Sequence, residues 1–268
     1  MTEYDGQPDR ARVPEPELTR EQSQADESDL RAGLRGLAEM VAGGREVEEL
    51  LAEIADFAAR AIPGVDGVGV TLMQDVNGTP QAQVWAVTAD FIGGFEVLQH
   101  ETVHEGPCIT CVQSRRPVVS GSLGNDRRWP RFGGRVARMG VHSGLALPLL
   151  VEDTVVGAIN CYSRDRDAFA EHAVQLGTQF AGATAVCVYN AQLLTQGRER
   201  EERLQRALGN RSIIDQAIGI IRSRSGGSPD DAFARLKRIS QSENVKVILV
   251  AERLVDEAVR SAEARRRF

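Results

Sequence analysis

Residues 211–238 read RSIIDQAIGIIRSRSGGSPDDAFARLKR and carry the strongest local structural signals in the chain. Their first part places apolar residues on one face of a helix, at Ile214, Ala217, Ile218 and Ile221. Gly226-Gly227 ends this helix. Ser228 then begins a second helix as its N-cap, with Pro229 at the first helical position and Asp231 as the acid of a capping-box variant.

Two further apolar stripes follow this capping signal. They lie at Phe233, Leu236 and Ile239, and at Val247, Val250, Ala251, Leu254, Val255 and Ala258. Helices this short are not stable alone and must pack on one another. The sequence therefore predicts an all-α three-helix domain at residues 204–262, followed by a basic tail at residues 263–268.

The preceding part of the chain has a different pattern. Helical periodicity comes first, then strand patterns, then a second helical pattern that opens at Ala168. Because the strands come in groups rather than in βαβ units, we expect an α+β domain at residues 30–194, an antiparallel sheet flanked by helices. Residues 195–203 are a helical connector, so that a long helix joins the two domains. Residues 1–29 are polar and acidic, and we expect them to be disordered.

Charge is distributed unequally between these parts. The chain has 32 Lys+Arg and 38 Asp+Glu, a net charge of −6. Residues 198–268 hold 16 basic and 11 acidic side chains, or +5, so the rest of the chain carries −11. This split favours a polyanionic partner for the C-terminal domain. Neither a membrane-spanning apolar run nor a secretory signal pattern is visible, so we expect a cytoplasmic protein that binds no membrane.

The C-terminal domain resembles the ANTAR domain, an RNA-binding module of bacterial transcription antiterminators. The resemblance covers residues 204–259 and rests on Arg211-x-x-Ile214-Asp215-Gln216-Ala217-x-Gly219-Ile220-Ile221, Ser228-Pro229-Asp230-Asp231-Ala232-Phe233, Leu236-Lys237, Asn244-x-Lys246 and Val250-Ala251. The chain departs from many members at Ile218, where they have Lys, and at Arg222, where they have Met.

Residues 46–194 resemble a GAF domain, of the kind often fused to ANTAR in actinobacteria. The matching residues are Glu105-Gly106-Pro107-Cys108, Arg128-Trp129-Pro130-x-Phe132, Gly140-Val141-x-Ser143, Leu147-Pro148-Leu149, Gly157-Ala158-x-Asn160 and Ala168-Phe169. The two resemblances imply a regulator of transcription antitermination that acts in signal transduction. Its GAF domain would sense a signal, and a homodimer would bind paired hairpins in mRNA leaders so that the terminator does not form.

Polar side chains on the three ANTAR-like helices are the candidate RNA-binding residues: Arg211, Gln216, Arg222, Lys237, Arg238 and Lys246. Guanidinium groups bind phosphate bidentately and stack on unpaired bases, which suits hairpin loops. The alternative is that these groups only solvate the helices. Reading of DNA in the major groove is disfavoured, because the third helix is mostly apolar.

Cys108-x-x-Cys111 is the main sign of enzymatic chemistry in the sequence. A thiol with a lowered pKa at a helix N-terminus would be a nucleophile or redox sensor, and some GAF-fold proteins reduce methionine sulfoxide with cysteines. Cys108 is alternatively a buried small apolar residue. A cysteine-based redox sensor or reductase is therefore the second hypothesis, but we expect no enzyme, no cofactor and no metal. Cys161 and Cys187 are isolated in the sequence, and His142 and His172 show no ligand spacing. His100 and His104, four residues apart, could share a metal on a helix, but Thr102, Val103 and Gly106-Pro107 disfavour a stable helix there.

The GAF-like domain also suggests a pocket for an unidentified small molecule. Its predicted lining combines aromatic walls with a few polar groups, at Trp85, Cys108, Trp129, Phe132, Ser143 and Asn160. The alternative is that these side chains fill a core. The partners expected from the sequence are thus RNA, a second copy of the chain, and a small molecule in the GAF-like domain.

Overall fold

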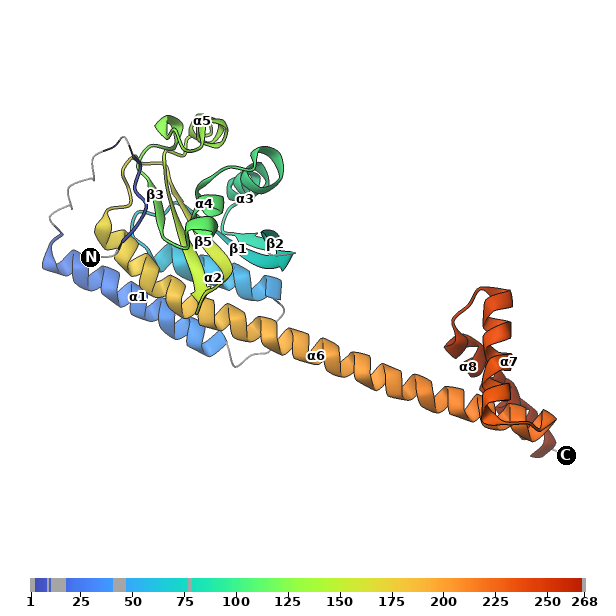
Figure 1. Cartoon of the computed structure of the whole chain (residues 1–268). Coiled ribbons are helices and arrows are strands. Elements are labelled where there is room, and N and C mark those ends of the chain that lie inside the picture. The colour runs from blue at the N-terminus through green and yellow to red at the C-terminus, as the bar shows by residue number, and fades with distance from the viewer. Residues whose placement is uncertain (1–2, 9, 11–17, 41–46, 77–78, 267–268) are drawn as a thin grey trace. The chain divides into compact units, whose positions relative to one another are not determined.

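A computed structural model describes residues 3–8, 10, 18–40, 47–76 and 79–266 (Figure 1). The chain divides into an N-terminal unit, Met1–Leu193, and a C-terminal unit, Leu194–Phe268. Helix α6 (Glu171–Ser225) contributes residues to both units. The fold class predicted from the sequence, an α+β domain followed by an all-α domain with a long helix between them, is confirmed. None of the helices in the described parts of the chain is long and apolar enough to span a membrane.

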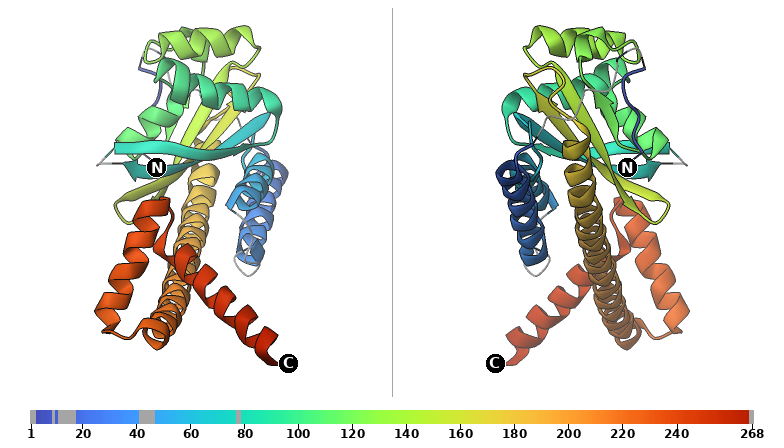
Figure 2. Two further views of the ribbon diagram at one scale, coloured as in Figure 1. Left: turned by 90° about the vertical axis from the view of Figure 1, so that its right-hand side faces the viewer. Right: turned by 90° about the vertical axis from the view of Figure 1, so that its left-hand side faces the viewer.

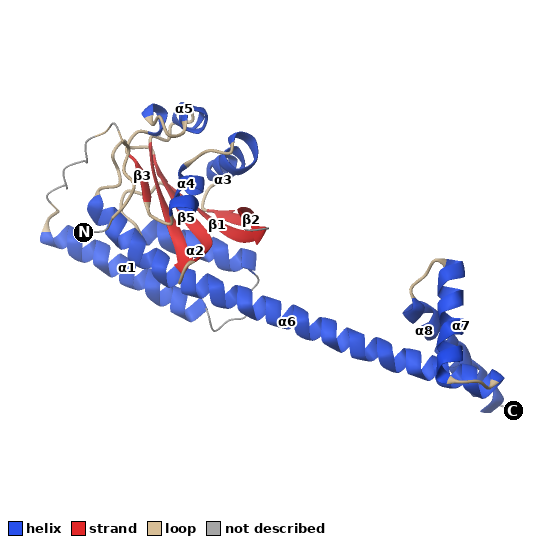
Figure 3. Ribbon diagram, viewed as in Figure 1, coloured by secondary structure: helices blue, strands red, loops and turns tan. Residues whose placement is uncertain are grey.

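The N-terminal unit is built on one five-stranded sheet (Figure 3). Its strands are β1 (Gly67–Val76), β2 (Thr79–Val87), β3 (Val118–Ser120), β4 (Ser143–Val151) and β5 (Thr154–Ser163). Their order across the sheet is β2-β1-β5-β4-β3, and neighbouring strands pair antiparallel. The central pair β1 and β5 therefore joins segments that are distant in the sequence.

Helices lie over both faces of this sheet (Figure 1 and Figure 2). One face is covered by α1 (Arg20–Met40), α2 (Val47–Ala61) and the first part of α6. The other face is covered by α3 (Asp90–Val97), the π-helix η1 (Leu98–Val103), α4 (Pro107–Ser114), the 3-10 turn η2 (Leu123–Asn125) and α5 (Pro130–Arg138).

Alternation along the central strands decides which side chains face which helices. Val68, Val70 and Leu72 of β1 belong to the apolar core beneath α1, α2 and α6. Thr71 of β1 and Asn160 of β5 point the other way and hydrogen-bond to a residue of α3. Because successive strand residues face opposite sides of a sheet, the same two strands supply an apolar core on one face and polar groups on the other.

The N-terminal segment differs from the disordered region expected at residues 1–29. Helix α1 begins at Arg20, after a capping box in which the Gln22 backbone N–H donates to Thr19 Oγ1 and the Thr19 N–H donates to Gln22 Oε1. Asp5 also forms a parallel bridge with Val118 of β3. Tertiary packing of an apolar stripe on α1 stabilises a helix whose overall polarity had indicated disorder. Residues 9 and 11–17 lie outside the described residues.

The C-terminal unit contains the end of α6 together with α7 (Pro229–Glu243) and α8 (Val247–Arg266). Its core is small and consists of Ala217, Ile221, Ala232, Leu236, Val250 and Ala251. The predicted capping box of α7 is confirmed, because the Asp231 N–H donates to Ser228 Oγ and the Ser228 N–H donates to Asp231 Oδ2, both at 3.1 Å. The predicted connector at residues 195–203 lies within α6.

Candidate functional site

A cluster of polar side chains is buried between the sheet and the helices α3, η1 and α4. We call it the buried polar cluster, and it consists of Thr71, Glu96, Gln99, His100, Cys108, Asn160 and Tyr162. Two strands and three helical segments contribute to it. Because apolar atoms normally fill such a position, this concentration of hydrogen-bonding groups marks it as the candidate site of the N-terminal unit.

Glu96 is the centre of the cluster and is completely buried. Its carboxylate accepts hydrogen bonds from the Thr71 hydroxyl at 3.1 Å, from Gln99 Nε2 at 3.0 Å and from Asn160 Nδ2 at 3.0 Å. All three donors are neutral. Among the described residues no Lys or Arg forms an ion pair with Glu96, and His100 is the one basic side chain beside its carboxylate.

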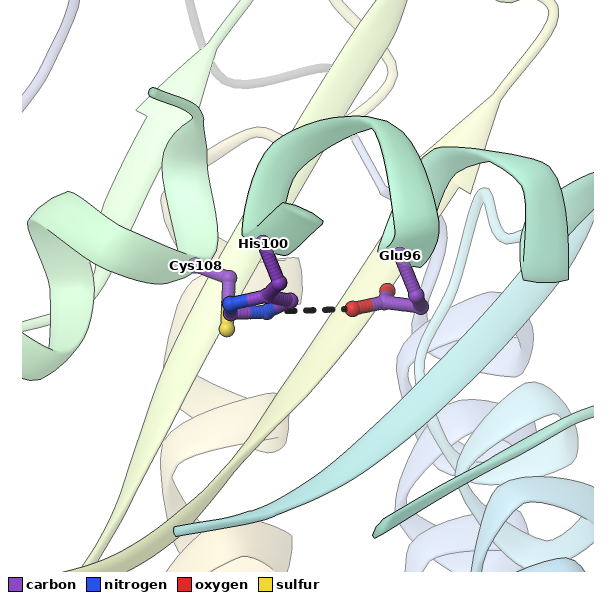
Figure 4. A group of neighbouring side chains, drawn as sticks. All are labelled: Glu96, His100 and Cys108. Atoms are coloured by element: carbon purple, nitrogen blue, oxygen red, sulfur yellow. Dashed lines mark ion pairs between the residues drawn. The ribbon is translucent and has the colours of Figure 1, made fainter. Parts of the chain in front are cut away.

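His100 lies on the π-helix η1, with its ring against the carboxylate of Glu96 (Figure 4). The Nε2 atom is 3.5 Å from Glu96 Oε2, but it makes no hydrogen bond with any described residue although it is buried. Trp85 of β2 stacks on the imidazole, with ring centroids 6.4 Å apart and ring planes inclined by 19°. The ring is thus held in place by packing while its Nε2 atom remains unsatisfied.

Two glycines give the cluster its room. A Cβ atom on Gly69 would lie 2.6 Å from Glu96 Oε1, and one on Gly106 would lie 2.5 Å from Gln99 Oε1. Real Cβ atoms do not approach oxygen so closely, so any larger residue at either position displaces a polar group of the cluster. Gly106 also precedes α4, whose Cys108 N–H donates to Gln99 Oε1.

Cys108 lies in the first turn of α4 and is completely buried. Burial raises the pKa of its thiol well above the usual range, and the nearby Glu96 carboxylate raises this pKa further. Hydrogen bonds with Asn160 and Thr71 act in the opposite direction but are weaker. The pKa of the Cys108 thiol is thus shifted upward, opposite to the lowering that the sequence position at a helix N-terminus suggested.

The structure brings together three of the six residues predicted to line the ligand pocket. Trp85, Cys108 and Asn160 belong to the buried polar cluster or contact it. Trp129 and Phe132 instead pack in the apolar core beneath α5, where Trp129 Nε1 donates to the Thr110 hydroxyl.

Ser143, the sixth of these residues, uses its hydroxyl to donate to the Asp165 carbonyl, away from the buried polar cluster. Sequence reasoning missed Glu96, Gln99 and His100 as site residues. A visible signal was the i,i+4 spacing of Glu96 and His100, which places both side chains on one side of a helix.

The residues predicted to bind RNA are all exposed on the C-terminal unit. Arg211 and Arg222 are eleven residues apart on α6, so at 3.6 residues per turn they lie within about 20° of each other around the helix. Gln216 is about 140° around the helix from Arg211 and does not share that face. Lys237 lies over the Phe233 ring on α7, at 5.4 Å from its centroid.

The basic side chains of the C-terminal unit fall into two groups. Arg224 pairs with Glu257, and Arg253 pairs with Glu243. A second group makes no ion pair with any described residue, and it includes all five basic residues predicted to bind RNA, Arg211, Arg222, Lys237, Arg238 and Lys246. Cations that no internal carboxylate neutralises are free to bind an external anion.

Comparison with known families identifies both units. The family model of the GAF domain matches residues 44–188, more than half of the chain, and that of the ANTAR domain matches residues 202–255. No curated protein sequence matches the chain.

Solved structures of the GAF fold are similar to the N-terminal part. One is the GAF domain of a phosphoenolpyruvate-protein phosphotransferase from Coxiella burnetii, at 15% identity and a TM-score of 0.49, covering 63% of this chain and 98% of that one. Another is the free methionine-R-sulfoxide reductase from Neisseria meningitidis, at 12% identity and a TM-score of 0.48, covering 69% of this chain and 99% of that one.

Proposed function

Because this chain belongs to the GAF domain family and is a regulator of the ANTAR type, we propose that it is a non-enzymatic, RNA-binding antitermination factor. Its ANTAR unit binds paired hairpins in nascent mRNA, and its GAF domain adjusts that binding to a signal. The observation that carries the proposal is that the five basic residues predicted to bind RNA are all exposed on the ANTAR unit and form no ion pair with a described carboxylate.

The chemistry of these side chains fits an RNA ligand. Arg211 and Arg222 present two guanidinium groups on one side of α6, where each can bind a phosphate bidentately or stack on an unpaired base. Lys237 and Arg238 add charge on α7. The net charge of +5 over residues 198–268, against −11 for the rest of the chain, directs a polyanion to this unit.

A homodimer is part of the proposal, and α6 supplies support for it. Val186, Leu193 and Leu194 are each about half exposed, and their i, i+7, i+8 spacing places them on one face of the helix. Exposed apolar stripes on long helices are typical of helix pairing. Two copies pair along residues 180–208, and a signal at the GAF domain changes that pairing. The second ANTAR unit then meets its hairpin at a raised effective concentration.

Burial of the cysteines supports a non-enzymatic role. Cys108, Cys111, Cys161 and Cys187 are all free and all buried, and burial raises the pKa of each thiol. The thiolate is the reactive species in cysteine catalysis and redox sensing. Raised pKa values and burial make these thiols poor nucleophiles, which disfavours the reductase hypothesis.

The proposal is tested by measuring the affinity of the full chain for a two-hairpin RNA and for DNA of the same sequence. Each affinity is measured at several salt concentrations. The logarithm of the RNA affinity should fall linearly with the logarithm of salt, by about 0.7–0.9 per phosphate contact. An Arg211→Ala, Lys237→Ala variant should reduce the magnitude of this slope by about 1.4–1.8, because it removes two phosphate contacts.

Arg224→Ala, Arg253→Ala is the matched control, because it removes two positive charges that already have internal partners. We expect its salt slope to stay close to that of the unaltered chain. Equal affinity for RNA and DNA, or an equal loss of slope in the control, would contradict the proposed site.

A further inference from the structure

Three different metal-ligand atoms meet in the buried polar cluster. The Glu96 carboxylate, one His100 ring nitrogen and the Cys108 Sγ all lie within 4.8 Å of one another (Figure 4). They come from α3, η1 and α4, so the fold has assembled them from three consecutive helical segments. Carboxylate oxygen, imidazole nitrogen and thiolate sulfur are the donor set of Zn²⁺ and related divalent transition-metal ions.

Unsatisfied buried atoms point to a missing partner at this place. His100 Nε2 is buried without a hydrogen bond from any described residue, and the His100 side chain as a whole is only 9% exposed. Asn160 Oδ1 is a second buried atom without a partner in the same cluster. Buried polar atoms are almost always satisfied, and a bound water or ion is one explanation of an exception of this kind.

The donor set also balances the charge of a divalent ion. Metal coordination deprotonates a thiol outright, so the Cys108 proton would be released to solvent when the ion binds. One divalent cation held by the Glu96 carboxylate and the Cys108 thiolate would then leave no net charge in the buried site.

The separations are compatible with direct coordination. Ligand bonds of about 2.0–2.3 Å in a tetrahedron keep the donor atoms about 3.3–3.8 Å apart. Donor atoms that are 4.8 Å apart therefore need to approach by about 1.0–1.5 Å, and closer ones by less, which side-chain rotations provide. Thr71, Gln99 and Asn160 already hold the Glu96 carboxylate in position, as the outer partners of a metal ligand do.

We propose that Glu96, His100 and Cys108 form a binding site for one divalent transition-metal ion, with Zn²⁺ as the ion that best suits the donors. Three protein ligands leave a fourth position, which a water or a small external ligand takes in sites that exchange or react. A π-helical turn, such as the one that carries His100, is often found at functional sites. The proposal concerns the N-terminal unit alone and does not depend on RNA binding.

Co²⁺ titration of the full chain tests this site, after removal of bound metal with a chelator and under reducing conditions. Thiolate coordination to Co²⁺ produces a charge-transfer absorption in the near ultraviolet, and tetrahedral geometry produces visible bands. We expect saturation at one ion per chain, and displacement of Co²⁺ by Zn²⁺. Cys108→Ser should remove the near-ultraviolet band, and Glu96→Gln and His100→Asn should each weaken Zn²⁺ binding by about 100-fold or more.

Matched controls are available for each ligand. Glu101→Gln and His104→Asn change an exposed carboxylate and an exposed imidazole beside the site, and Cys187→Ser changes a thiol on α6 outside the metal-ligand group. All three should bind Co²⁺ and Zn²⁺ as the unaltered chain does.

Circular dichroism of the metal-free variants identifies any that do not fold. His100→Asn decides the question if Cys108→Ser is unfolded, because the His100 Nε2 makes no hydrogen bond whose loss would destabilise the fold. The proposal is overturned if the unaltered chain shows no thiolate band and no 1:1 Zn²⁺ binding. It is equally overturned if a folded ligand variant binds Zn²⁺ as tightly as its control.

Discussion

Replacing Leu236 with alanine tests whether the ANTAR unit is held together by its own core. Leu236 is completely buried, and three of the other five core residues of this unit are alanines. Truncation of a buried leucine costs about 3 kcal/mol, the sum of lost burial and an unfilled cavity. Domains of this size rarely have more than about 3–5 kcal/mol of stability. The substitution should therefore remove most of the stability of the unit.

Urea unfolding followed by two signals separates the units. Both tryptophans of the chain, Trp85 and Trp129, lie in the N-terminal unit, so tryptophan fluorescence reports that unit alone. Far-ultraviolet circular dichroism reports the helices of both. With a urea dependence of about 1 kcal/mol per molar for a small domain, the midpoint of the ANTAR transition should fall by about 3 M. The fluorescence midpoint should not change, and RNA binding should be lost.

Leu249→Ala is the control for this experiment, because Leu249 lies on α8 in the same unit and is 47% exposed. Its cost should be within about 0.5 kcal/mol. If fluorescence and circular dichroism shift together in Leu236→Ala, the two units do not unfold separately. If both leucine variants have the same midpoint, the core assigned to the ANTAR unit is wrong.

Three further predictions follow from local contacts. Gly69→Ala should destabilise the N-terminal unit by about 1–3 kcal/mol in fluorescence-monitored urea unfolding, because the new Cβ atom would clash with the Glu96 carboxylate. Its control is Gly94→Ala, which has open space around the added Cβ atom and should be neutral or stabilising by up to about 1 kcal/mol. Ser228→Ala should cost the ANTAR unit about 1 kcal/mol at neutral pH by circular dichroism. Hydrogen bonds with Ser228 lower the pKa of Asp231 in the folded chain. The loss of unfolding free energy in Ser228→Ala should therefore be fully present above the unfolded pKa of about 3.9 and shrink as the pH falls below it. A loss that does not change with pH would contradict the capping role. A thiol reagent should label the four buried cysteines only after denaturation, and rapid labelling of the native chain would restore the reductase hypothesis.

Features set by neighbours in the chain were predictable from the sequence. The start of α7 depends on contacts between Ser228 and Asp231, three residues apart, and its position was predicted correctly. Period-two and period-3.6 patterns likewise predicted an antiparallel sheet with flanking helices. Helix α1 was the exception: its capping box at Thr19 and Gln22 was visible, but a polar composition outweighed it in the interpretation.

The buried polar cluster was decided by tertiary structure. Its members come from β1, α3, η1, α4 and β5, and the register that places Gly69 opposite Asn160 brings the two strands together. No local pattern indicates that Glu96 will be buried against a glycine of a distant strand. The predicted pocket likewise divided between this cluster and the apolar core around Trp129.

The sequence by itself thus determined the order and type of the two domains, because helix periodicity, capping and strand alternation are interactions over a few residues. It also determined which unit is basic, since charge is a property of composition. Sheet register, and the packing of helices over one face of the sheet, decide which polar groups are buried next to one another. Only the tertiary structure could place Glu96, His100 and Cys108 within ligand distance of one another.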